Sequence, residues 1–306
     1  MLKRNAVALG IASALMATPA APQDDAPDGA ARYLQSPWWP YLSTHMEDDS
    51  PPAIVGGPIE VSITQDGGAV TWILPGPRQL DPTIFGTIDN PKATETPPIG
   101  VPLGGRQEQA DGTFVTANPV PASDNAIGVE GTLDLRLVDQ TATDAAVTED
   151  EIQLVATFSA PDGSGTYRIE VDTPLSHGWY SPTVGGVGTN LMMHGLTKWE
   201  NQIMPTFFAY ATFWGLGDIY LDDELIAEDA FIHGMLTEGI RGEGYRMVAD
   251  ENVNPEFRHF HLMGFPHTPQ GEPNPIPTGF VTEGGAEQPF FHIMYDTPTV
   301  EGLALE

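Results

Sequence analysis

The fold class of this chain follows from residues 152–171, which read IQLVATFSAPDGSGTYRIEV. Apolar residues occupy every second position from Ile152 to Phe158 and again from Tyr167 to Val171. Because side chains alternate between the two faces of a strand, this period of two predicts two strands, each with one buried face. The intervening residues 161–165, PDGSG, are rich in turn formers. We therefore predict a β-hairpin.

The same pattern recurs on both sides of this hairpin. Alternating apolar residues in 59–63 and 70–74, separated by Asp66-Gly67-Gly68, predict a second hairpin, and 133–137 predict a further strand. Beyond Pro174 the apolar segments lack alternation, as in strands that are covered on both faces. These segments are residues 207–214, 218–221, 230–236, 259–265 and 289–295.

Glycine and proline interrupt most candidate helices. Residues 218–233 lack both and could form a helix, although Asp222-Asp223 between two apolar runs favours a hairpin turn. We predict an all-β protein, an antiparallel sandwich or jelly-roll-like fold with one or two β domains. The expected parts are a signal peptide (1–21), an irregular acidic N-terminal segment (22–52), an N-terminal β region (53–174) and a C-terminal β region (175–306).

The first residues have the pattern of a secretory signal. Lys3 and Arg4 precede an apolar run in residues 6–16, which is followed by small residues around Ala20 and Ala21. We expect cleavage there and a secreted or periplasmic product. No later segment approaches the roughly 20 continuous apolar residues that a membrane-spanning helix needs, so no membrane span is expected.

The composition excludes several partners and chemistries. The net charge of −30 disfavours binding to nucleic acid or to anionic lipid. An acidic surface with few lysines is typical of halophilic proteins, which stay soluble in high salt. The chain has no cysteine, which excludes disulfides, thiolate zinc sites and a cysteine nucleophile. No serine-hydrolase elbow, zinc-protease helix or phosphate-binding loop is present.

Histidine and methionine recur together in the C-terminal half. With 8 histidines and 10 methionines in 306 residues, repeated His-x-Met spacing is uncommon by chance. Residues two apart in a strand share a face, so each pair presents an imidazole and a thioether on the same side. The motifs are His233-Gly234-Met235, His261-Leu262-Met263 and His292-Ile293-Met294, together with Met192-Met193-His194.

Imidazole and thioether together are ligands for soft metals, and they favour copper, with zinc as the alternative. His259 and His261 share one face and are the best candidate ligands. The predicted set is completed by His233, His292, Met235, Met263, Met294 and His194. Asp296 shares the face of His292 but lies too far along the strand to bind the same ion.

Two functions remain open at this point. The first is an exported protein that binds a transition metal, most simply copper, as a carrier or a redox enzyme. The second is a non-catalytic surface or ligand-binding β module in which histidine and methionine are core residues. The partner is accordingly a metal ion or a small molecule, and the sequence leaves open whether the protein is an enzyme.

Overall fold

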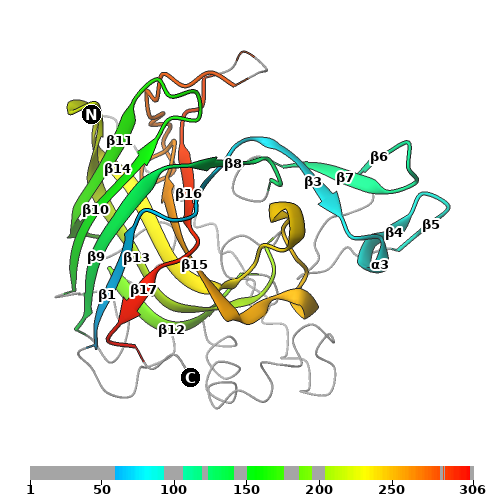
Figure 1. Ribbon diagram of the computed structural model, residues 1–306, viewed down its shortest axis with the longest axis horizontal. Helices are drawn as coiled ribbons and strands as arrows, with labels where there is room; N and C mark the ends of the chain where they lie inside the picture. Colours follow the sequence, from blue (N-terminus) through cyan, green and yellow to red (C-terminus); the bar gives the residue numbers. More distant parts are fainter. Residues whose placement is uncertain are drawn as a thin grey trace, which may run out of the picture.

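The computed structural model describes residues 59–92, 106–118, 123–140, 150–175, 186–194, 204–282, 285 and 287–303. Within these residues the chain is all-β apart from short helical turns, which confirms the predicted fold class (Figure 1). The predicted signal peptide (1–21) and the whole acidic N-terminal segment (22–52) lie outside the described residues. In the part that is described, no helix has the length and apolar character to span a membrane.

The elements are β1 (Ile59–Asp66), β2 (Val70–Ile73), β3 (Gly76–Leu80), α3 (Pro82–Phe85), β4 (Gly86–Thr87), β5 (Asn90–Pro91), β6 (Gln107–Glu108), β7 (Phe114–Asn118), β8 (Ala126–Val129), β9 (Gly131–Asp139), β10 (Glu151–Ser159), β11 (Thr166–Pro174), β12 (Val187–Met193), β13 (Phe207–Leu221), β14 (Glu224–Gly239), η5 (Glu243–Tyr245), η6 (Asp250–Asn252), β15 (Asn254–Gly264), β16 (Phe291–Tyr295) and β17 (Thr299–Glu301).

Most strands belong to one 12-stranded antiparallel sheet. Its order is β17-β1-β9-β10-β11-β13-β14-β15-β16-β2-β8, and β12 pairs with the first half of the long strand β13. The sheet curls into a half-barrel, and β3, β7 and β6 form a smaller sheet beside it (Figure 1). Strands from both sides of Pro174 therefore share one sheet.

Two of the predicted hairpins are confirmed. β10 and β11 pair around residues 161–165. β13 and β14 pair around Asp222 and Asp223, whose φ angles of 48° and 68° lie in the left-handed region. Asp tolerates this conformation better than most residues, which explains why the chain turns there instead of forming a helix.

The predicted pairing of residues 59–63 with 70–74 is wrong, although both segments are strands. β1 pairs with β9 and β17, whereas β2 pairs with β16 and β8. The turn between them joins strands near opposite ends of the sheet. A short turn can do this because the sheet curls and brings these ends close together. The Gln65 amide stabilises the turn by donating to the carbonyls of Gly67 and Ala69.

The curled sheet has a core on each side. The larger core lies on one face and centres on an aromatic cluster of Trp72, Phe158, Tyr167 and Phe291. A second core covers the other face of β13 to β15 and includes several methionines. These central strands are thus buried on both faces, as their continuous apolar sequences predict.

Candidate functional site

A row of three predicted site residues crosses the central strands. The pairing of β14 with β15 places His233 opposite Met263, and the pairing of β15 with β16 places Met263 opposite His292. Directly opposed residues in antiparallel strands have Cβ atoms about 5 Å apart. Met263 is therefore flanked by an imidazole on each side.

A second row lies beside the first with the residue types reversed. His261 is opposite Met235 on β14 and opposite Met294 on β16. Because the members of the two rows are two residues apart on each strand, both rows project from the same face of the sheet. We call these six side chains the His/Met face: His233, Met235, His261, Met263, His292 and Met294.

The His/Met face is fully enclosed. Its most exposed member, Met263, retains only 6% of its accessible surface, and His261 and His292 retain none. Met235 and Met263 pack in the second core with Trp214 and Phe231. Since a buried polar group is costly without a hydrogen bond, the partners of each imidazole are informative.

His233 is held in a defined tautomer and orientation. Its ring stacks on the indole of Trp214, with centroids 4.8 Å apart and planes 18° apart. Its Nδ1 lies 2.7 Å from the carbonyl oxygen of Phe213, and a carbonyl only accepts, so Nδ1 carries the proton. Burial lowers the pKa of His233 to about 4. The ring is neutral, and its Nε2 lone pair has no hydrogen-bond partner among the described residues.

His292 and His261 form a directed hydrogen-bond chain. The Thr237 hydroxyl donates to the carbonyl of Glu238, so it accepts from Nε2 of His261 at 3.2 Å. Burial holds the pKa of both imidazoles well below the usual value, which keeps both rings neutral. His261 Nδ1 therefore accepts from Nε2 of His292, also at 3.2 Å. This leaves Nδ1 of His292 as a buried lone pair without a described partner.

His259 is oriented by a carboxylate. Its Nδ1 donates to Asp296 Oδ1 at 2.7 Å, and its Nε2 has no partner in the described part of the chain. The same carboxylate accepts from the Tyr245 hydroxyl at 2.7 Å and from the Thr71 hydroxyl at 3.0 Å. His259 and His261 do share a face of β15, as predicted, but they bond to different groups.

His194 lies just beyond the end of β12 and outside the two rows. It is buried, and its ring packs against Phe207 at a centroid distance of 5.0 Å. The guanidinium of Arg241 is also buried, and it donates to the Ser123 carbonyl. A positive charge on Arg241 helps to keep the pKa of His261 and His292 low.

The possible ligand sets are restricted by this geometry. Among the described residues, no three His, Asp or Glu side chains are arranged to hold one ion. An ion held by three side chains of the His/Met face would therefore have a thioether sulfur among its ligands. The row of His233, Met263 and His292 places such a sulfur between two imidazoles with available lone pairs.

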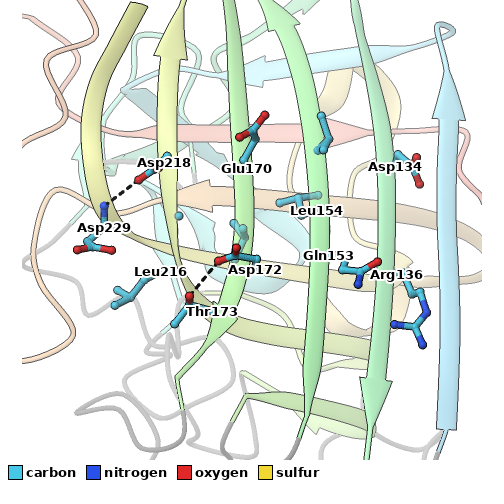
Figure 2. A pocket seen from close by; sticks show the side chains of 13 residues that line it. Asp134, Arg136, Gln153, Leu154, Glu170, Asp172, Thr173, Leu216, Asp218 and Asp229 are labelled. Atoms are coloured by element: carbon cyan, nitrogen blue, oxygen red, sulfur yellow. Dashed lines mark hydrogen bonds between the residues drawn. The ribbon is translucent and has the colours of Figure 1, made fainter.

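The outer surface of the sheet carries a separate feature. An open pocket of about 440 Å³ lies over β9, β10, β11 and β13 (Figure 2). Arg136 at its edge pairs with Glu60 and Glu151. The remaining charged lining is acidic and comprises Asp134, Glu170, Asp172, Asp218 and Asp229.

Several residues of the site were not predicted from the sequence. Asp296 was considered only as a ligand beside His292, whereas strand pairing places it against His259. Thr237 and the Phe213 carbonyl fix two tautomers, and Tyr245 reaches Asp296 from a turn. The shared parity of Asp296 with His292 was the one available signal, although Asp296 lies one residue beyond the end of β16.

Comparison of the chain with protein-family models, with curated proteins and with solved structures finds no match.

Proposed function

We propose that this protein binds Cu(I) on the His/Met face, with Nε2 of His233, Sδ of Met263 and Nδ1 of His292 as ligands. The observation that carries the proposal is the His-Met-His row, in which both imidazoles have a buried lone pair without a described partner. Leaving such groups unsatisfied costs about 1–3 kcal/mol each, and a bound ion would remove this cost.

The outer hydrogen bonds of the two imidazoles support the proposal. A histidine that binds a metal usually donates its other N–H to a carbonyl, a carboxylate or water, which fixes the ring and makes the ligating nitrogen more basic. His233 donates to the Phe213 carbonyl, and His292 donates to His261. Both residues therefore donate a second hydrogen bond that fixes the ring, His233 to a usual acceptor and His292 to another imidazole.

The ligand types favour copper over zinc. Thioether sulfur is a soft ligand that selects Cu(I), whereas zinc sites more often use thiolate, imidazole and carboxylate. Catalysis would require an open coordination position that substrate can reach. Because the face is buried, we propose a carrier or storage role in preference to a redox enzyme.

The proposal includes the location of the protein. The signal-like residues 1–21 support export, and the net charge of −30 supports a saline surrounding and argues against nucleic acid as a partner. The intact mass of protein recovered from the secreted or periplasmic fraction tests export. Retention of residues 1–16 in that fraction contradicts it.

Titration with Cu(I) in competition with a chromophoric Cu(I) chelator tests the site. The wild type should take up one Cu(I) per chain, and the double variant His233→Gln/His292→Gln should lose this uptake. Met263→Leu should weaken Cu(I) binding while preserving packing, because Leu and Met have similar volumes. His267→Gln, outside the His/Met face, is the matched control and should bind as the wild type does. Equal uptake by the wild type and the double variant rejects the site.

A second candidate function is a ligand-binding β module whose histidines and methionines are core residues. The open acidic pocket over β9 to β13 favours this function (Figure 2). A ligand could reach the carboxylates of this pocket, whereas the side chains of the His/Met face are buried. A protein that takes up no Cu(I), yet unfolds cooperatively and loses stability on substitution of His233, would support this alternative.

A further inference from the structure

Tyr245 and Asp296 form a hydrogen-bonded pair beside the His/Met face. The Tyr245 hydroxyl donates to Asp296 Oδ1 at 2.7 Å, and Asp296 retains only 7% of its accessible surface. His259 Nδ1 donates to the same oxygen, and the Thr71 hydroxyl donates to Oδ2. The phenol thus bonds directly to a buried carboxylate whose position is fixed by two further donors.

The backbone of Tyr245 supports a specific role for this pair. Its φ of 61° lies in the left-handed region, which a large side chain rarely adopts. The turn is held by Arg241, which donates to the Tyr245 carbonyl at 3.3 Å. Residues held in such conformations cost of order 1–3 kcal/mol and cluster at functional sites. The residue in this unusual conformation is the one whose phenol bonds to the carboxylate.

Two fully buried tyrosines provide a comparison with the partly buried Tyr245. The Tyr167 hydroxyl donates to the carbonyl of Thr278, and the Tyr295 hydroxyl donates to the carbonyl of Thr157. A backbone carbonyl accepts a hydrogen bond but is far too weak a base to keep the proton. Asp296 is an acceptor of a different kind, because a carboxylate that gains a proton becomes a stable neutral acid.

We propose that Tyr245 is a redox-active tyrosine that transfers its phenolic proton to Asp296 when an outer-sphere metal complex acts as a one-electron oxidant. The oxidant takes one electron from the phenol, the O–H bond of Tyr245 breaks, and a new O–H bond forms at Asp296 Oδ1. The products are a neutral tyrosyl radical, a neutral carboxylic acid and the reduced oxidant.

Electrostatics favours this step at Tyr245 over the comparison tyrosines. Burial penalises charged groups. Oxidation of Tyr245 neutralises the carboxylate and creates no new buried charge. Oxidation of Tyr295 would instead leave a radical cation in the core, since its hydroxyl faces only a carbonyl. Of these three tyrosines, Tyr245 should therefore be the one that carries the radical. This inference does not depend on metal binding by the His/Met face.

Photochemical oxidation of the full chain tests the inference. Tris(bipyridine)ruthenium(II), oxidised to ruthenium(III) by a flash and an irreversible quencher, serves as the oxidant, and electron paramagnetic resonance detects the radical. The wild type and the control variant Tyr295→Phe should give the same tyrosyl signal. Tyr245→Phe should lose it, and Asp296→Asn should lose most of it while circular dichroism shows an intact sheet.

Each outcome decides the inference. Absence of a tyrosyl signal in the wild type, or its persistence in Tyr245→Phe, overturns the proposal. A full signal in folded Asp296→Asn shows that the carboxylate is not the proton acceptor and also overturns it. If Asp296→Asn fails to fold, double-resonance spectroscopy of the wild-type radical decides: an exchangeable proton hydrogen-bonded to the phenoxyl oxygen supports the transfer, and its absence overturns it.

Discussion

Nδ1 of His261 lies 3.2 Å from Nε2 of His292, and the two imidazole rings are stacked with centroids 5.4 Å apart. Because Thr237 fixes the proton on Nε2 of His261, the proton shared by the pair belongs to His292. His261 therefore accepts this hydrogen bond. The free lone pair of His292 is the one on Nδ1. In the proposed site His261 is a positioning residue for the ligand His292.

Replacement of this positioning residue should weaken metal binding without removing a ligand. We expect His261→Phe to lower Cu(I) affinity about 10- to 100-fold, the usual effect of removing an outer hydrogen bond from a ligating histidine. It should also lower the unfolding free energy by about 1–3 kcal/mol, because the N–H of His292 loses its acceptor. Chelator competition and urea unfolding measure the two effects. An unchanged affinity would show that His261 does not support the ligand.

The buried imidazoles predict a loss of stability in mild acid. The pKa of His233 falls from 6.5 to about 4 on folding because burial disfavours its charged form. Below pH 6.5, His233 binds a proton in the unfolded chain but stays neutral in the folded chain. The contribution of His233 to stability is therefore complete above this pH and is lost as the pH falls toward 4.

The slope due to His233 should approach about 1.4 kcal/mol per pH unit between these two values. Urea unfolding at pH 7 and pH 5 should therefore show a smaller pH-dependent loss in His233→Gln than in the wild type. Met263→Leu, which changes no titrating group on the same face, should retain the wild-type loss. Identical slopes in His233→Gln and the wild type would mean that this imidazole titrates normally.

The close packing of the larger core predicts a steric effect at Gly234. A Cβ atom there would lie 2.4 Å from the ring of Phe213 and 2.8 Å from that of Phe260. We expect Gly234→Ala to lower the unfolding free energy by about 1–3 kcal/mol through overpacking. Gly128→Ala is the matched control, since its added Cβ meets nothing within 4 Å and the residue is also in a strand. Equal stability of the two variants would contradict the packing described for β14.

The acidic composition predicts stabilisation by salt. With a net charge of −30, screening of repulsion between carboxylates should raise the unfolding temperature as sodium chloride is added. Sodium sulfate at equal ionic strength separates screening from salting-out, because screening alone gives the same increase with both salts. A flat melting temperature across the chloride series would indicate that the acidic groups are already compensated locally.

The strands themselves could be predicted from local sequence. The alternation in residues 152–158 and 167–171 specifies two half-buried strands, and the short turn between them leaves pairing with each other as the simplest arrangement. The same reasoning failed for residues 59–63 and 70–74, whose strands pair elsewhere. A short turn limits the distance between two strands, but the curl of the whole sheet determines their neighbours.

The sequence by itself determined which side chains share a face on each strand, because the backbone period of two follows from local geometry. It thereby placed His261 with Met263 and His292 with Met294. Only the tertiary structure decided that Met263 lies between His233 and His292 and that Asp296 reaches His259. Strand order and register depend on burying two cores at once, which is a property of the whole sheet and not of any single strand.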